Sequence, residues 1–177
     1  MGAINISKTE TVNADADHIW RILSEEFDSV DGWASSVNHS EMNTKATNTP
    51  EGAPPGRLCT VPGFGVTDER MTRYDDAERS FAFSVDAEKI PGFFTNMESA
   101  WRVEPIGPGR SRVTTKVSGN ANGVMGALVR PMMKRKFKKT IDVVYEDLKV
   151  YAETGKPSAA KAKADEKYQR QLAKAKG

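Results

Sequence analysis

Residues 124–151 read VMGALVRPMMKRKFKKTIDVVYEDLKVY, and this stretch predicts a long amphipathic helix. About 30 helical residues, each rising about 1.5 Å, would extend roughly 45 Å. Pro131 is expected to kink the helix or divide it from a preceding turn, and Gly155 and Pro157 are expected to end it. The apolar residues recur at steps of three to five positions, as on one buried helical face: Val124, Leu128, Met132 or Met133, Phe137, Ile141, Val144, Leu148 and Tyr151. A continuous stripe of this length needs a wide, curled sheet to cover it.

Short segments with strand character precede this helix. Strong turn signals separate them, among them Pro62-Gly63-Phe64-Gly65 and Ile90-Pro91-Gly92. The alternation of Phe81, Phe83 and Val85 is typical of a half-buried strand. The segments follow one another too closely for crossover helices, so we expect an antiparallel sheet. The predicted strands span residues 3–12, 57–62, 66–75, 80–88, 95–104 and 112–118.

Two short helices are expected after the first strand. Asn13 or Asp15 can cap the first of them, whose apolar stripe runs from Ile19 to Phe27. The second is expected at residues 33–37. The order of elements predicts an α+β helix-grip fold, in which a curved antiparallel sheet of about seven strands wraps around the long C-terminal helix.

The chain divides into one domain and a basic tail. Residues 1–155 are expected to form the helix-grip domain. Residues 156–177 are rich in Ala and Lys and offer only Tyr168 and Leu172 for burial, so we expect a solvated tail that is disordered or a frayed helix. The tail carries seven basic and two acidic residues, whereas the preceding part has more acidic than basic residues. Nucleic acid is therefore not an expected partner.

Cys59 is the only cysteine, which excludes an intramolecular disulfide and a thiolate-cluster metal site. His18 and His39 lie far from it in the sequence, so an inert buried thiol is favoured over a nucleophile. We predict no metal site and no cofactor. The N-terminal segment lacks the apolar centre of a signal peptide, and no apolar run reaches the ~20 residues of a membrane span. We expect a soluble cytoplasmic protein.

A series of local motifs runs through residues 3–155. They are Ala14-Asp15-Ala16-Asp17-His18-Ile19-Trp20, Trp33, Pro55-Gly56-Arg57, Asp68-Glu69-Arg70-Met71, Tyr74-Asp75-Asp76, Phe81-Ala82-Phe83-Ser84-Val85, Asp147-Leu148-Lys149 and Glu153-Thr154-Gly155. In their order and spacing they resemble the START-like (Bet v 1-like, SRPBCC) superfamily, in particular its polyketide cyclase/dehydrase branch. The resemblance implies a helix-grip domain with an internal cavity for a hydrophobic ligand.

The same stretch is similar to the ligand-binding half of the plant abscisic-acid receptors. The residues that correspond to receptor pocket positions are Glu69, Phe83, Val85, Phe94 and Asn96. Two loops close the receptor pocket, and the resemblance implies that residues 61–65 and 88–92 are their counterparts. Neither loop matches the receptor sequences closely, so a hormone-receptor role is not implied.

Glu69 is the sharpest candidate for a functional residue. Alternation along its strand places Thr67, Glu69, Met71 and Arg73 on one face. A carboxylate there needs a cation or ordered water, and Arg73 or Lys116 could supply the cation. Three roles stay open for Glu69: binding a polar group of the ligand, acid/base catalysis, or a structural salt bridge. The candidate ligand-binding residues are Phe64, Glu69, Met71, Arg73, Phe83, Val85, Phe94, Asn96, Trp101, Lys116, Phe137, Ile141 and Val144.

These observations favour binding or carriage of a small hydrophobic molecule, such as a lipid or polyketide, over catalysis. The alternative is a polyketide aromatase/cyclase, for which Glu69 is the one catalytic candidate. Arg130–Lys139 holds six cations in ten positions. This run is either the solvated side of the last helix or, together with the tail, a contact for an anionic membrane or an acidic partner. Both a monomer and a homodimer fit the sequence.

Overall fold

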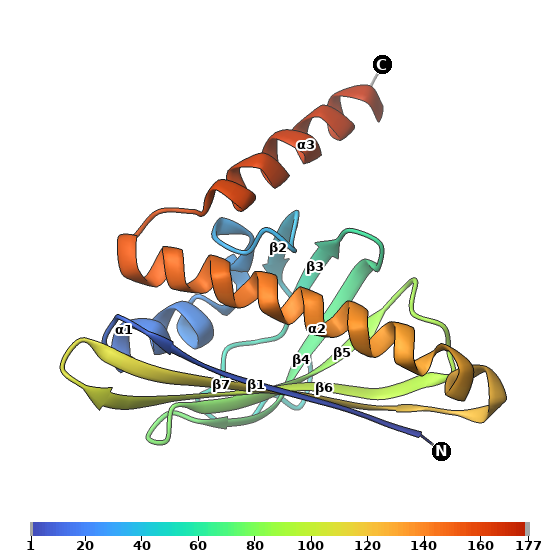
Figure 1. Cartoon of the computed structure of the whole chain (residues 1–177), viewed down its shortest axis with the longest axis horizontal. Coiled ribbons are helices and arrows are strands. Elements are labelled where there is room, and N and C mark those ends of the chain that lie inside the picture. Colours follow the sequence, from blue (N-terminus) through green and yellow to red (C-terminus); the bar gives the residue numbers. More distant parts are fainter. Residues whose placement is uncertain (1, 176–177) are drawn as a thin grey trace.

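The computed structural model describes residues 2–175, in which one long helix lies across a seven-stranded sheet (Figure 1). All neighbouring strands are antiparallel, in the order β1-β7-β6-β5-β4-β3-β2. The strands are β1 (Gly2–Val12), β2 (His39–Met42), β3 (Arg57–Val61), β4 (Gly65–Asp75), β5 (Ser80–Ala87), β6 (Phe94–Gly107) and β7 (Arg110–Ala121). This is the helix-grip fold that the sequence predicts.

Short turns connect the strands of the meander. Gly63 adopts φ 80° in the β3–β4 turn, and Gly109 adopts φ 61° in the β6–β7 turn, a backbone conformation that favours glycine. The sequence prediction missed β2, a four-residue strand that pairs with β3 at the edge of the sheet. Its residues show no clear alternation of burial, because only Ser40 is buried.

The segment after β1 is less regular than predicted. It begins as α1 (Ala16–Trp20), widens into a π-helical turn, η1 (Arg21–Glu25), and continues as a 3-10 segment, η2 (Phe27–Gly32). Three successive residues of η1, from Ile22 to Ser24, are buried, which one face of a regular α-helix does not provide. The second helix is therefore η2, and the predicted helix at residues 33–37 is wrong, since turns and bends occupy that range.

The long helix α2 (Gly123–Thr154) is continuous through Pro131 and ends at Gly155, whose φ of 68° forms the left-handed cap. Its C-terminal half covers the core, where Tyr145 and Leu148 have no exposed surface. The predicted stripe does not stay buried at its N-terminal end, however. Each four-residue step advances about 40° around a helix of 3.6 residues per turn, so the row Val124, Leu128, Met132 turns away from the sheet.

Polar contacts tie the middle and the end of α2 to β1. Lys8 Nζ lies 2.8 Å from Asp142 Oδ1, and Lys149 Nζ lies 2.8 Å from Glu10 Oε2. The Tyr145 hydroxyl lies 3.1 Å from the carbonyl oxygens of both Lys8 and Val113. Burial raises the pKa of Tyr145, which keeps its hydroxyl a hydrogen-bond donor.

The predicted tail contains a further helix, α3 (Ala159–Ala175), which projects from the C-terminal end of α2 (Figure 1). Asp147 anchors its start, accepting hydrogen bonds from Ser158 and from the backbone N–H of Ser35, the latter at 2.7 Å. Lys161 is buried, with its ammonium 3.1 Å from the Val37 carbonyl oxygen. From the sequence, only Tyr168 and Leu172 are expected to be available for burial in this segment. The residue of α3 that is buried is instead Lys161. No helix within residues 2–175 combines the length and apolar character needed to cross a membrane.

Candidate ligand-binding site

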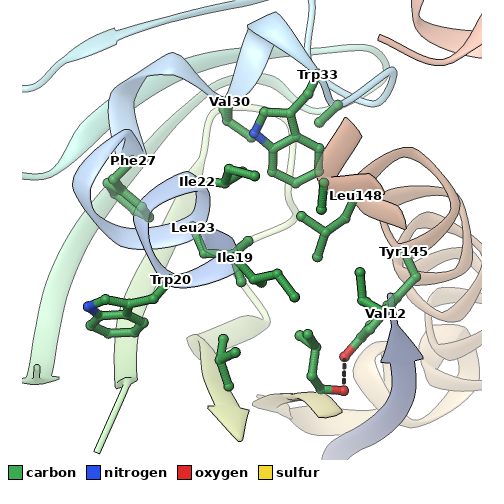
Figure 2. Close-up of a cluster of buried hydrophobic side chains, with 14 of the residues drawn as sticks. Val12, Ile19, Trp20, Ile22, Leu23, Phe27, Val30, Trp33, Tyr145 and Leu148 are labelled. Carbon is green, nitrogen blue, oxygen red and sulfur yellow. Dashed lines mark hydrogen bonds between the residues drawn. The ribbon is translucent and has the colours of Figure 1, made fainter. Parts of the chain in front are cut away.

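A cavity of about 200 Å³ lies between the sheet and α2. Residues of η1 and η2, and the residue that follows η2, bound one end of the cavity: Leu23, Phe27, Val30 and Trp33. Figure 2 shows these residues within the cluster of buried side chains that α2 completes with Leu148. The walls of the cavity are mostly aliphatic and aromatic, as in pockets that bind apolar molecules.

Many of the predicted ligand-binding residues line this cavity. They come from β4, β5, β6, the β3–β4 turn and α2, elements that the fold brings together around one space. The predicted residues that line it are Phe64, Glu69, Phe83, Val85, Trp101, Phe137, Ile141 and Val144. Their contact with a ligand stays a prediction.

Two predicted residues are turned away from the cavity by β-bulges. The register of β4 against β5 shifts between Met71 and Arg73, so Arg73 is exposed and pairs with Glu98 at 2.7 Å. The register of β6 against β7 shifts after Thr95, and Asn96 is exposed with φ 52°. The extra residue in a bulge reverses which of the following side chains face the cavity. A pattern of strict alternation along the sequence does not predict this reversal.

Lys116, Met71 and Phe94 also lie outside the cavity. Thr115 and Val117 face the cavity, so Lys116 between them is exposed on the other side of the sheet. Met71 is packed in the main core, and Phe94 belongs to a second, smaller core cluster. Neither Arg73 nor Lys116 therefore supplies the cation that Glu69 was predicted to need.

Arg57 supplies that cation. Its Nε and Nη2 atoms each lie 2.7 Å from Glu69 Oε2, and Nη1 donates to the Phe27 carbonyl oxygen at 2.6 Å. The guanidinium also lies 3.9 Å from the centre of the Phe27 ring. Glu69 Oε1 accepts a 3.3 Å hydrogen bond from Thr67. Both charged side chains are 11% exposed, so a largely buried ion pair forms part of a cavity wall that is otherwise mostly apolar.

The hairpin of β3 and β4 explains this pairing. Its turn is centred on Gly63, so Arg57 and Glu69, six residues to either side, are direct cross-strand partners. Gly56 is also required here, because a Cβ atom at this position would lie 2.2 Å from the Glu69 carbonyl oxygen. A turn centred on Gly63, within the predicted turn at residues 62–65, was the sequence signal that could have identified Arg57.

Trp33, another residue that lines the cavity, has a buried polar atom in its side chain. The side chain is 4% exposed, and its indole Nε1–H has no hydrogen-bond partner among residues 2–175. A buried donor without an acceptor costs about 1–3 kcal/mol. An acceptor atom on a ligand within reach of this N–H would recover that free energy.

The two predicted closing loops meet over one side of the cavity. Phe64, from the first loop, stacks on Phe137 of α2 with ring centres 6.0 Å apart, and Lys136 Nζ lies 3.9 Å from the centre of the Phe64 ring. The second loop is hydrogen-bonded to the first through Lys89 N and the Phe64 carbonyl oxygen at 3.0 Å. Ile90 of the second loop also lines the cavity. Phe64 and Phe137 thus cover this side of the cavity in this conformation.

Cys59 lies on β3, buried beside the cavity wall. Burial raises the pKa of its thiol to about 12, so the thiolate is disfavoured near neutral pH. His39 is brought next to this strand by β2, but its ring lies near Asp31, at 3.4 Å, on the exposed side. Within the described residues, no group of three or more His, Cys, Asp or Glu side chains is placed to hold a metal ion.

The model of the family described as polyketide cyclase/dehydrase and lipid transport matches residues 3–153. The chain belongs to this family. The family and the fold support binding of a hydrophobic molecule in general, and the apolar cavity is the matching feature of this structure. No curated protein sequence matches the chain.

Solved structures show the same fold at low sequence identity. A START superfamily protein from Mycobacterium smegmatis is 21% identical, with a TM-score of 0.66 over 86% of this chain and 98% of that one. The protein XoxI from Bacillus cereus is 16% identical, with a TM-score of 0.66 over 85% and 96%. Ara h 8.0201 is 11% identical, with a TM-score of 0.58 over 83% and 98%. This family member therefore has the START-like, Bet v 1-like fold.

Proposed function

We propose that the protein binds or carries a small hydrophobic molecule in the cavity between the sheet and α2. The observation that carries this proposal is the cavity itself, whose walls are mostly apolar and which contains the ion pair of Arg57 and Glu69. Burial of apolar surface would provide most of the binding free energy. The polar groups would orient a ligand that carries a hydrogen-bond acceptor.

The size of the cavity narrows the class of ligand. A volume of about 200 Å³ is slightly larger than the ~150 Å³ engineered cavity that holds benzene. It is smaller than the roughly 300–1,000 Å³ of pockets for drug-sized molecules. A compound of one or two rings or a short acyl chain fits a cavity of this volume. A longer polyketide or a diacyl lipid requires Phe64 and Phe137 to separate.

A cavity-filling substitution tests this proposal. Val144 lines the cavity, whereas Val150 on the same helix is 38% exposed and does not. We expect Val144→Phe to weaken binding of 2-naphthol, followed by the fluorescence of the protein's tryptophans or by calorimetry, by at least about tenfold. Val150→Phe should bind like the unchanged protein. Equal binding by both variants would show that the probe does not enter the cavity.

Native mass spectrometry of protein purified from its own host gives a test without a chosen probe. A co-purifying hydrophobic molecule that is lost from the Val144→Phe variant would support the proposal and identify the ligand.

The alternative is a polyketide aromatase/cyclase that acts in the same cavity, which the family description supports. Glu69 is the acid/base candidate facing the cavity, but its Oε2 atom accepts a hydrogen bond from Arg57 Nε and lies 2.7 Å from Arg57 Nη2. Turnover of a linear polyketide that is lost in Glu69→Gln, while binding of the same compound persists, would favour the enzyme.

A further inference from the structure

The outward face of the first turns of α2 carries large apolar side chains that the fold leaves in solvent. Val124 is 85% exposed, Leu128 73%, Met132 62% and Met125 57%. Exposed Pro131 lies on the same side of the helix. Together these five residues form the apolar tip of α2. A contiguous exposed apolar patch of this kind is typical of an interaction surface.

The rotation of the helix is fixed by its other side. Gly126 faces the sheet, and a Cβ atom there would lie 2.7 Å from the backbone of Ala121. Met133, further along the same inner side, is buried in the second core cluster. The helix cannot roll to bury its apolar tip without separating these contacts, so the tip faces outward in the folded protein.

Cations follow the apolar tip along the same helix. They are Arg130, Lys134, Arg135, Lys136, Lys138 and Lys139, and no Asp or Glu occurs in the sequence between Glu104 and Asp142. Only Lys138 among them has a carboxylate within 4.0 Å in the described part of the chain, that of Asp142 at 3.8 Å. The first half of α2 is therefore an apolar end followed by a band of largely uncompensated positive charge.

We propose that this half of α2 docks on an anionic lipid bilayer. The apolar tip would enter the boundary between headgroups and acyl chains, and the cations would meet the lipid phosphates. The order of the two zones along the helix matches the order of these layers, and long Lys and Arg side chains can reach the headgroups while their stems stay in apolar surroundings.

Charge also argues against a second copy of the chain as the occupant. Two such faces brought together would place one band of cations near the other, and like charges in close contact oppose association. The helix α3, with its own cations, leaves α2 at the opposite end from Val124 (Figure 1). The proposed contact therefore uses Val124–Lys139 and does not use the tail that the sequence had suggested as an aid.

The proposed surface adjoins the closure of the cavity. Lys136 in the cationic band covers Phe64, and the next residue, Phe137, stacks on the same ring. Docking would bring this closure to the membrane, where a hydrophobic ligand is dissolved. That consequence rests on the proposed ligand binding, whereas docking itself does not.

Co-sedimentation with vesicles tests the docking. We expect the full chain to bind vesicles of equal parts phosphatidylglycerol and phosphatidylcholine, and to bind phosphatidylcholine vesicles far more weakly. Leu128→Glu combined with Met132→Glu should weaken binding by at least about tenfold, because it removes the inserted apolar side chains. Ile106→Glu is the matched control, since Ile106 is 38% exposed on β6 near the β6–β7 turn. It should bind like the unchanged chain.

A second pair of variants tests the cations without touching the apolar tip. Arg135→Gln and Lys139→Gln should each weaken binding to the anionic vesicles by about fivefold and reduce its dependence on salt. Thermal unfolding should stay unchanged in all these variants, because the altered side chains are exposed.

Equal binding to neutral and anionic vesicles, or full binding by Leu128→Glu/Met132→Glu, would overturn the proposal. So would a concentration-dependent dimer that only this double variant abolishes, which would make the face a self-association surface. Val144→Phe should dock normally, so loss of ligand binding and loss of docking can be told apart.

Discussion

The two halves of α2 have similar apolar spacing and opposite surroundings. In the C-terminal half, Tyr145 and Leu148 have no exposed surface and Ile141 is 7% exposed. In the N-terminal half, Val124 is 85% and Leu128 73% exposed. The C-terminal half forms the cavity wall and the core, and the N-terminal half presents apolar and cationic side chains to solvent. The apolar periodicity of α2 is similar in both halves, so it does not by itself show which half is buried and which half faces solvent.

The difference arises from the contacts of each half with the sheet. The C-terminal half lies over β1 and β7, held by hydrogen bonds and ion pairs to Lys8 and Glu10. The N-terminal half touches the end of β7 through Gly126, whose missing side chain allows one close contact on its inner face. A row at four-residue spacing drifts around the helix, so it can stay buried only where neighbours surround the helix on several sides.

The largest expected effect is the loss of stability on removing a buried cation, compared with removing an exposed one. Arg57→Met leaves Glu69 without its cation in a site where the side chain is 11% exposed. We expect the free energy of unfolding to fall by about 3–5 kcal/mol, because the remaining buried carboxylate is uncompensated. Arg135→Met, on the exposed half of α2, should change it by no more than about 0.5 kcal/mol. Urea unfolding at pH 7, followed by circular dichroism, measures both.

A second variant tests whether the loss of stability comes from the uncompensated charge of Glu69 rather than from the loss of the Arg57 side chain itself. Arg57→Met combined with Glu69→Leu removes both charges and should recover most of the stability lost in Arg57→Met. A fall of less than about 1 kcal/mol in the single variant would indicate that water reaches the pair.

The next comparison uses one amino-acid type in both halves. Leu148→Ala should lower the free energy of unfolding by about 2–5 kcal/mol, because it opens a cavity in the core. Leu128→Ala should change it by no more than about 0.5 kcal/mol, since Leu128 is already in solvent. Equal losses in the two variants would mean that the N-terminal half of α2 is packed in solution, and would remove the basis of the docking proposal.

Much of the fold could be predicted from the sequence, because local periodicity and turn residues determine each element. The antiparallel meander and the end of α2 at Gly155 follow from such local signals. The irregular elements could not be predicted from such local signals. The π turn at Arg21–Glu25 and the anchoring of α3 by buried Lys161 depend on tertiary contacts that composition does not record.

The site was predicted in part for the same reason. Alternation grouped Glu69 with Arg73 on one face of a strand and Phe83 with Val85 on one face of the next, and the resemblance implied that these residues line the cavity. Glu69, Phe83 and Val85 do line it. Alternation failed for Arg73 and the resemblance failed for Asn96, since each follows or forms a bulge whose extra residue shows no signal in the sequence. The partner of Glu69 required the register between two strands, a property of the hairpin rather than of either strand.

The smallest expected effect concerns the ion pairs that hold the C-terminal half of α2 to β1. The hydrogen bond from Lys149 holds the pKa of Glu10 below its ordinary value of 4.5, and that from Lys8 holds the pKa of Asp142 below 3.8. A carboxyl group with a lower pKa in the folded state stabilises the fold above its unfolded pKa, and this contribution is lost as the pH falls through the folded pKa. Stability from these pairs should therefore be complete at pH 6, begin to fall near pH 4.5, and be lost as the pH falls through the lowered folded-state pKa values. Because both pairs are partly exposed, we expect a small loss that added salt reduces.

Glu10→Gln combined with Asp142→Asn tests this expectation. Urea unfolding at pH 6 and pH 3 should show a smaller loss of stability on acidification in the double variant than in the unchanged chain. An identical loss in both would assign the acid sensitivity to other groups of the protein. Vesicle binding measured on the double variant at pH 6 should not be weakened, because neither residue lies on Val124–Lys139 and the change removes the carboxylate that pairs with Lys138. Acid would then loosen one half of α2 while leaving the chemistry of the other half unchanged, which is the separation that the structure implies.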